Sequence, residues 1–364
     1  MKDKQSVLFL EKVFIRPFLG QTRGVELFNF SLVQQLVQRD IHVCLLIHHS
    51  WKEMIGTVFH ETEGKEPEIV YVSSNPVNIL FSLNRFSCRR FNVLLAGNVA
   101  NSFILLLSML WMMRIAPRCV VIAHRRPSRG FLYAQKLWRD TTVVAVNSII
   151  VNDFRKAGFR NVAVYYGIIN ADKFYPRESP LVNEHVNFCV LGYLDSPWKG
   201  VDTVVSAFTA LPEQVKKRCM LHLASFSHPP SFTESNIKTY SWLSPDTVPE
   251  FLRNMDVMIV PSRDEKVMRE TFSQAMVQGM LTGLPVVVNN VPVLTEKINN
   301  GGGLVFSNVS ELTEIIILLT ECPELRKRLG RMARKVAIER YVWNTDFFVE
   351  HYLFPKDFID TGSS

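Results

Sequence analysis

Two stretches of the C-terminal half combine residue types that could bind an anion and a polyhydroxylated ligand. In VLGYLDSPWKGVDTVVSAF, residues Lys199 and Gly200 stand where a glycine-containing turn runs into a helical pattern. The free N–H groups of a helix N-terminus and a lysine ammonium both attract negative charge. This turn could therefore bind a phosphate group, although a plain surface loop with a capped helix contains the same residue types.

The second stretch is RETFSQAMVQGMLTGLPVVV, in which Glu270 stands at the start of an almost uncharged run. We expect Thr271 and Ser273 to enter a helix and to leave their N–H groups available at its start. Glu270 would then accept hydrogen bonds from ligand hydroxyl groups, and Gln278 would lie two turns further on along roughly the same side. The alternative is that Glu270 only caps the helix dipole.

The elements that carry these residues alternate between short apolar runs and amphipathic segments. Five of these runs are apolar at consecutive positions, which point to opposite faces of a strand. This is typical of strands buried on both faces of a parallel sheet. The runs are SVLFLEKV, HVCLLIHH, NVLLAG, CVVIAH and TVVAVNS. GVELFNFSLVQQLVQRD has the period of a helix. Such alternation predicts a doubly wound α/β sheet with ligands at the carboxyl ends of its strands.

The same alternation restarts after the linker FYPRESPLVNEH, with VNFCVLGYL, MLHLAS, DVMIVPS and LPVVVNN. Gly283 is expected to close the helix before the last of these strands. The sequence therefore predicts two Rossmann-like domains with a cleft between them. Their expected bounds are 1–172 and 173–340, with a C-terminal helix at about 341–364 that crosses back onto the first domain.

Composition agrees with a folded intracellular chain. The 364 residues suit about two domains, and 47% hydrophobic with 21% charged residues suits large buried cores. The six cysteines stand singly, and His42, His48 and His49 lack partners at ligand spacing, so we expect no metal site. MKDKQSVLFLEKVF resembles a first strand rather than a signal peptide, and a cytoplasmic location is expected.

Positive charge is concentrated in one region. The formal net charge of the chain is +7. The segment from Arg85 to Arg139 contains ten basic residues and no acidic one, which more than accounts for this excess. A solvated face is one interpretation; the other is peripheral contact with an anionic membrane or a phosphorylated acceptor. No motif for nucleic acid accompanies the charge. The uncharged stretch from Val93 to Met113 is better explained by a strand and a buried helix than by a transmembrane helix.

Taken together and in order, these motifs resemble a known family. GIINADKFYP, GYLDSPWKGVDTVVSAF, WLSPDTVPEFLRNMDVMIVPS, ETFSQAMVQGMLTGLPVV and EKINNGGGLVF are similar to the C-terminal domain of retaining GT-B glycosyltransferases of family 4. LGQTRGVELFNFSLVQQLVQRDIHV, VVIAHRRPS, VVAVNSIIVNDFRKAGF and the terminal RYVWNTDFFVEHYL resemble its remaining parts. The resemblance covers nearly the whole chain.

The resemblance implies transfer of a sugar from a nucleotide donor to a hydroxyl group with retention of configuration and without a metal or other cofactor. It implies catalytic roles for His124, Lys199 and Glu270. The implied donor-binding residues are Gly20, Gly24, Gly192, Tyr193, Lys199, Thr271, Phe272, Ser273 and Gln278. The implied acceptor is a glycan or lipid-linked molecule of cell-surface polysaccharide, lipopolysaccharide or glycolipid synthesis.

Three positions depart from the family pattern. Tyr193 and Gln278 stand where the family has arginine and a second glutamate, and Arg125 replaces an acidic neighbour of His124. A charge-assisted hydrogen bond is about twice as strong as a neutral one, so these changes weaken the expected donor site. A degenerate GT-B protein that acts as a scaffold therefore stays an alternative, as does an epimerase or phosphorylase on the same fold.

Overall fold

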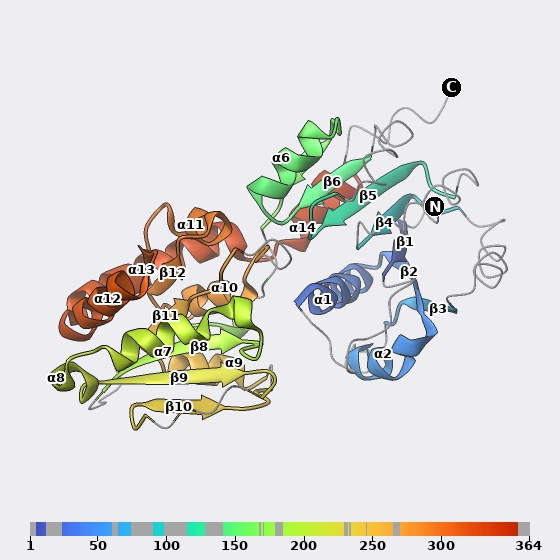
Figure 1. Ribbon diagram of the computed structural model, residues 1–364. Helices are drawn as coiled ribbons and strands as arrows, with labels where there is room; N and C mark the ends of the chain where they lie inside the picture. Colours follow the sequence, from blue (N-terminus) through green and yellow to red (C-terminus); the bar gives the residue numbers. More distant parts are fainter. Residues whose placement is uncertain are drawn as a thin grey trace. The chain divides into compact units, whose positions relative to one another are not determined.

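The computed structural model describes residues 5–11, 24–59, 65–73, 90–97, 115–127, 141–166, 169, 171–178, 185–228, 232, 234–244, 246–264 and 270–355. The chain divides into two compact units (Figure 1). The first unit comprises Met1–Tyr166 together with Asn344–Ser364, and the second comprises Gly167–Trp343.

In the described part of the first unit, seven parallel strands form one sheet in the order β3-β2-β1-β4-β5-β6-β7. They are β1 (Ser6–Leu10), β2 (His42–His48), β3 (Glu68–Val72), β4 (Val93–Ala96), β5 (Arg118–Ala123), β6 (Thr142–Ala145) and β7 (Val162–Val164). The helices are α1 (Gly24–Gln38), η1 (His49–Trp51), α2 (Lys52–Phe59) and α6 (Ser148–Lys156). The five apolar runs of the N-terminal half form β1, β2, β4, β5 and β6, as predicted.

In the second unit, the strands that the structure describes form a six-stranded parallel sheet in the order β10-β9-β8-β11-β12-β13. They are β8 (Val186–Gly192), β9 (Cys219–Ser225), β10 (Ile237–Tyr240), β11 (Val257–Val260), β12 (Val286–Asn289) and β13 (Gly303–Phe306). The two sheets confirm the doubly wound α/β class. The strand order reverses between β8 and β11, and a ligand crevice is expected at such a reversal.

Helices cover both faces of this second sheet (Figure 1). The described helices of this unit are η2 (Ala171–Lys173), η3 (Pro197–Lys199), α7 (Val201–Thr209), α8 (Glu213–Lys216), α9 (Val248–Arg253), α10 (Gln274–Leu281), α11 (Pro292–Ile298), α12 (Val309–Glu321) and α13 (Pro323–Tyr341). One core joins α7 and α12 to the sheet and includes Phe188, Leu221, Ile259, Phe208 and Ile316. On the opposite face, Gly279 of α10 packs directly on Met258 of β11.

Gly283 ends α10, as predicted. Its φ of +82° lies in the left-handed region that glycine adopts without strain. The N–H of Gly283 donates to the Met280 carbonyl and the N–H of Leu284 to the Gly279 carbonyl, both at 3.0 Å. This pair of bonds is the Schellman motif, which turns the chain from α10 into β12.

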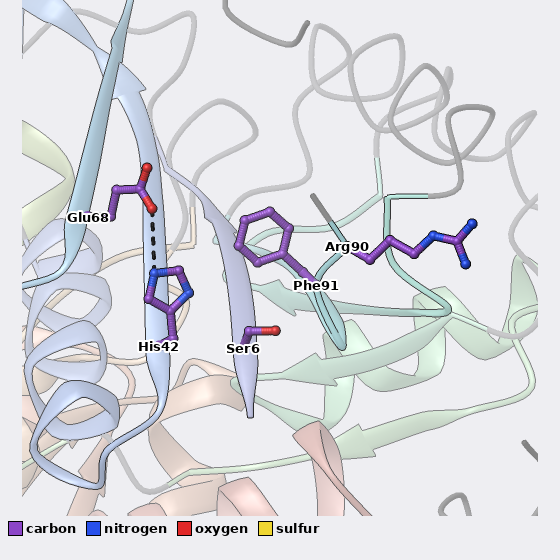
Figure 2. Close-up of a pocket in the computed structure, with 5 residues that line it drawn as sticks. All are labelled: Ser6, His42, Glu68, Arg90 and Phe91. Carbon is purple, nitrogen blue, oxygen red and sulfur yellow. Dashed lines mark ion pairs between the residues drawn. The ribbon is translucent and has the colours of Figure 1, made fainter. Parts of the chain in front are cut away.

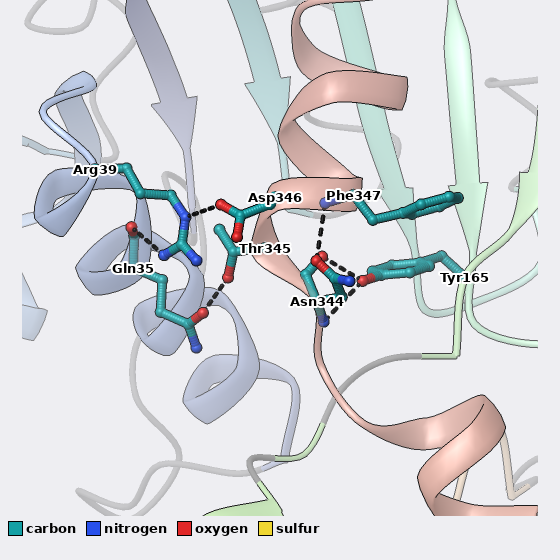
Figure 3. A network of polar contacts seen from close by, with 7 residues as sticks. All are labelled: Gln35, Arg39, Tyr165, Asn344, Thr345, Asp346 and Phe347. Carbon is teal, nitrogen blue, oxygen red and sulfur yellow. Dashed lines mark hydrogen bonds and ion pairs between the residues drawn. The ribbon is translucent and has the colours of Figure 1, made fainter.

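The last described segment, with α14 (Thr345–Phe348) and the π-helical turn η4 (Val349–Leu353), packs on the first unit (Figure 3). Arg39, which directly follows α1, has its Nε 2.6 Å from Asp346 Oδ1, and Thr345 donates a hydrogen bond to Gln35 of α1. The Tyr165 hydroxyl donates to the Asn344 carbonyl at 2.6 Å. These polar contacts join the end of the chain to α1 and to the segment after β7.

Within the described ranges, no helix is long and apolar enough to cross a membrane. The stretch from Val93 to Met113 begins with the predicted strand, β4, and the helix predicted after it lies outside those ranges. So do six of the ten basic residues between Arg85 and Arg139. Of the other four, Arg118 donates hydrogen bonds to the Tyr352 carbonyl and the Thr142 hydroxyl, and Arg126 lies 2.9 Å from Asp153.

Candidate active site

Lys199 is held at the carboxyl edge of the second sheet by a tight turn after β8. The 3-10 helix η3 ends at Lys199, and Gly200 follows with φ +68° before α7 begins. The Lys199 ammonium lies 4.2 Å from the centre of the Trp198 ring, and its aliphatic stem passes beside Gly192. The turn therefore directs the ammonium over the end of β8, toward the point where the strand order reverses.

The same edge carries Glu270, which meets Lys199 there. The Lys199 Nζ atom lies 2.8 Å from Glu270 Oε2, and the two side chains are only 17% and 10% exposed. The hydroxyl of Ser262, which follows β11, donates to the same carboxylate oxygen at 3.3 Å. Two residues that are 71 positions apart thus form a nearly buried ion pair because β8 and β11 are neighbours in the sheet.

The other carboxylate oxygen of Glu270 stabilises the turn into α10. Oε1 accepts a hydrogen bond of 3.1 Å from the N–H of Ser273, whose φ of +59° is rare for a residue with a side chain. We expected the Ser273 N–H to be available for a ligand. In the structure it instead donates to Glu270 within the protein. The N–H of Phe272 has no hydrogen-bond acceptor among the described residues.

Charge at this site favours an ionised Glu270. Burial acts most strongly and raises the pKa of Glu270, but the charge and hydrogen bond of Lys199 and two weaker contributions together outweigh it, so the pKa lies below its ordinary value. The charge of Lys297 and the N–H of Ser273 act in the same direction. Lys297 itself is 2% exposed, and burial lowers its pKa to about 8.

The other predicted donor-binding residues of the second unit lie on the segment after β8, in the Glu270 turn and on α10. Tyr193 follows β8 and packs on the Phe226 ring, with 5.6 Å between ring centres. Gln278 lies on α10 with a half-buried side chain, and no hydrogen bond to Glu270 is found in the described structure. Phe272 is buried, and its ring lies 6.0 Å from that of Tyr341. Thr271 is half-buried in the same turn.

Three predicted site residues belong to the first unit. His124 follows β5, is 8% exposed and packs edge-on against the Phe28 ring at 5.3 Å. Gly24 is the first residue of α1, and Gly20 lies outside the described residues. Arg125 is exposed beside His124. The proposed catalytic role of His124 stays a prediction.

Sequence patterns did not single out two buried polar groups. Lys297 lies beneath the Glu270 turn, where its ammonium is 4.8 Å from the centre of the Phe272 ring. In the first unit, Glu11 follows β1 and is fully buried; Oε2 accepts a hydrogen bond of 2.6 Å from the equally buried Asn29. A signal existed for Glu11, because it interrupts the apolar run of the first strand.

A hollow of about 330 Å³ lies in the first unit, at the amino ends of the strands of its sheet (Figure 2). Its lining residues are Ser6, His42, Glu68, Arg90 and Phe91. His42 lies 3.4 Å from Glu68, but the two side chains are 41% and 35% exposed, as in an ordinary surface pair. Ligands of such sheets bind at the carboxyl ends of the strands, so this hollow is not the candidate active site.

Comparisons with known proteins show what this chain resembles. Residues 176–336 match the family model of glycosyl transferases group 1. A curated relative, MMP alpha-(1->4)-mannosyltransferase of Mycolicibacterium hassiacum, is 27% identical over 218 residues, which are 56% of this chain and 50% of that protein. The alignment thus spans only half of that relative's length.

Solved structures share the fold. Alr3699/HepE of Anabaena in complex with UDP-glucose superposes with a TM-score of 0.67 at 18% identity, over 93% of this chain and 95% of that chain. WaaG, a glycosyltransferase involved in lipopolysaccharide biosynthesis, gives a TM-score of 0.61 at 16% identity, over 94% and 98% of the two chains. Residues 176–336, which contain Lys199 and Glu270, thus match the glycosyl transferases group 1 family model, and the chain that carries them has the GT-B fold.

Proposed function

We propose that this protein is a retaining glycosyltransferase that moves a sugar from a nucleotide-sugar donor to a hydroxyl acceptor. The observation that carries the proposal is the Lys199–Glu270 pair at the strand reversal between β8 and β11. It places a cation, a carboxylate and the starts of α7 and α10 at one edge of the sheet. A diphosphate suits the cation and the helix starts, and sugar hydroxyls suit the carboxylate.

In the proposed reaction, the bond between the anomeric carbon and the diphosphate oxygen breaks, and the acceptor oxygen bonds to the same face of the carbon. The acceptor proton passes to the departing diphosphate, so no protein nucleophile is required. Lys199 and the N–H of Phe272 stabilise the negative charge that develops on the diphosphate. Glu270 accepts hydrogen bonds from sugar hydroxyls and orients the donor.

The relatives support, but do not fix, the substrates. A UDP-glucose complex of Alr3699/HepE makes UDP-glucose the first donor to test, and the mannosyltransferase relative makes a mannose donor the second. The likeness to WaaG supports an acceptor in cell-surface polysaccharide, lipopolysaccharide or glycolipid synthesis.

A thermal-shift panel of UDP, GDP, ADP and TDP tests the donor site. At a hundredfold excess over its Kd, a ligand adds about 2.7 kcal/mol to stability, so the matching nucleotide should raise Tm by a few degrees. The shift should disappear in Lys199→Ala and grow in Tyr193→Arg, which adds a cation after β8. If no nucleotide shifts Tm in either the native protein or Tyr193→Arg, the scaffold alternative replaces the proposal.

Product analysis with the matching sugar donor separates the enzyme classes. Transfer to an added acceptor supports the glycosyltransferase. Release of an isomerised sugar nucleotide would instead indicate an epimerase, and phosphate-dependent cleavage would indicate a phosphorylase.

We also propose that the basic segment from Arg85 to Arg139 brings the protein to an anionic membrane that carries the acceptor. Sedimentation with anionic vesicles, but not with neutral ones, is expected, and it should weaken as salt rises because the screening length falls to about 8 Å at physiological ionic strength. Arg125→Glu should reduce the binding. Arg118→Gln is the control, because Arg118 is bonded within the fold. Equal sedimentation with both vesicle types would contradict this proposal.

A further inference from the structure

Lys297 is a buried cation in an otherwise apolar position. It lies on α11 among Val293, Leu294 and Ile298, all of them buried, and is itself 2% exposed. No carboxylate lies within ion-pairing distance of it in the described part of the chain. Its ammonium donates one hydrogen bond, of 2.8 Å, to the Val293 carbonyl. Burial of an ammonium without a paired anion lowers stability, so an apolar side chain here would give a more stable fold.

The ammonium of Lys297 lies directly beneath the turn that carries Glu270. A helical side chain points back toward the helix N-terminus, and here this direction leads to the Phe272 ring, whose centre is 4.8 Å from Nζ. Tyr341 of α13 packs on the same ring. The charged groups that face Lys297 are Glu270, before α10, and Glu296, on its own helix.

The charges at the site explain what this cation can do. Lys199 and Glu270 together are neutral, whereas a diphosphate is an anion. If Lys199 turns to the diphosphate, as the proposed function requires, Glu270 loses its paired cation while a second anion arrives beside it. Lys297 is the remaining cation whose field lowers the pKa of Glu270.

We propose that Lys297 is a positioning residue of the donor site: its ammonium holds the Glu270–Ser273 turn through the Phe272 ring and supplies the counter-charge of Glu270 when Lys199 binds the diphosphate. The inference rests on the proposed function, because that function moves Lys199 to the diphosphate. Lys297 is thus a second cation of the proposed donor site beside Lys199, and the donor does not contact it.

The first test needs no ligand. Lys297→Met keeps the length of the side chain and removes its charge, and Lys335→Met removes an exposed lysine of α13 as the matched control. Titration of the Glu270 carboxyl, followed by carbon-13 NMR and assigned with Glu270→Gln, should move to higher pH in Lys297→Met only. Lys297→Arg, which stays charged, should restore the native titration. If Lys297→Met does not fold, Lys297→Leu replaces it.

The second test follows turnover of UDP-glucose, or of a GDP-sugar if the panel selects GDP, from pH 5 to pH 9. Lys297→Met should lower kcat roughly tenfold, or by about 1.4 kcal/mol of transition-state stabilisation, because Glu270 then lacks its counter-charge when Lys199 binds the diphosphate. It should also remove the loss of activity expected of the native enzyme above about pH 8, where Lys297 releases its proton. An unchanged Glu270 titration in Lys297→Met overturns the inference. A native protein that turns over no donor contradicts the proposed function instead, and the NMR result distinguishes the two failures.

Discussion

Gly200 lies so close to Pro261 that any side chain added at Gly200 would overlap the Pro261 carbonyl oxygen. Gly200 directly precedes α7 and Pro261 directly follows β11, so this contact joins the turn that carries Lys199 to the segment that leads into Ser262. The geometry of the candidate site therefore depends on a residue with no side chain.

We expect Gly200→Ala to destabilise the protein by about 1–3 kcal/mol, because it combines this overlap with a positive φ. Urea unfolding measures the effect. Gly56→Ala is the matched control: Gly56 lies in α2, with no atom within 4 Å of an added Cβ, and alanine there should stabilise by roughly 0.5–1 kcal/mol. Equal stability of the two variants would show that the contact with Pro261 is not tight.

Lys199→Ala and Glu270→Gln should each lower donor turnover by roughly 100-fold or more, the scale of losing one preorganised contact at a developing charge. Both should remain folded, as checked by circular dichroism. Lys327→Ala is the control, because Lys327 forms an ion pair of the same 2.8 Å length with Glu324 on the exposed side of α13. Near-native turnover in either site variant would remove that residue from the site.

His222 predicts an acid-sensitive second unit. Burial lowers its pKa to about 4, and its ring nitrogens lie 2.9 Å from the Tyr240 hydroxyl and 3.1 Å from Asn187 Oδ1. As pH falls, the His222 ring binds a proton in the unfolded chain near pH 6.5, whereas in the folded protein it does so only near pH 4. The contribution of the neutral ring to the free energy of unfolding is therefore complete above pH 6.5 and is lost toward pH 4. His222→Gln should flatten Tm over this range, whereas exposed His351→Gln should not. A native Tm that does not fall in this window would contradict the prediction.

The low pKa of Lys297 makes a prediction of the same sense, but in an alkaline window. Between pH 8 and 10.5 the unfolded state holds this proton and the folded state has released it, so the native protein gains stability as pH rises. Relative to Lys297→Met, the gain should approach about 3 kcal/mol by pH 10.5. Urea unfolding at pH 7, 9 and 10 measures the difference, and a constant difference would show that Lys297 is not buried as a charge.

Central strands could be predicted from the sequence, whereas edge strands could not. The predicted strands of both units are covered on two faces, which requires the continuous apolar runs that the sequence displays. The four strands that were not predicted, β3, β7, β10 and β13, are the edges of the two sheets. In β10, Lys238 and Thr239 are exposed, and in β13 Val305 is 41% exposed. An edge strand is half-covered, so its sequence resembles that of a loop.

The candidate site was accessible to sequence reasoning only in part. Local patterns placed Lys199 and Glu270 at helix starts, but their meeting depends on the adjacency of β8 and β11, which no local pattern encodes. Lys297 stands in the helical stretch PVLTEKI, where a lysine usually extends into solvent. Only the packing of α11 against the Glu270 turn directs this side chain inward.

The second unit is an insertion in the first, and this has a consequence for synthesis of the chain. The segments that enter and leave it pair at Ile169 and Val342, and the Trp343 N–H donates to the Ile169 carbonyl at 3.1 Å. Translation therefore completes the second unit while the first still lacks the segment that covers Gln35 and Arg39. The first half of the nascent chain must wait for the last part to leave the ribosome before it can finish folding.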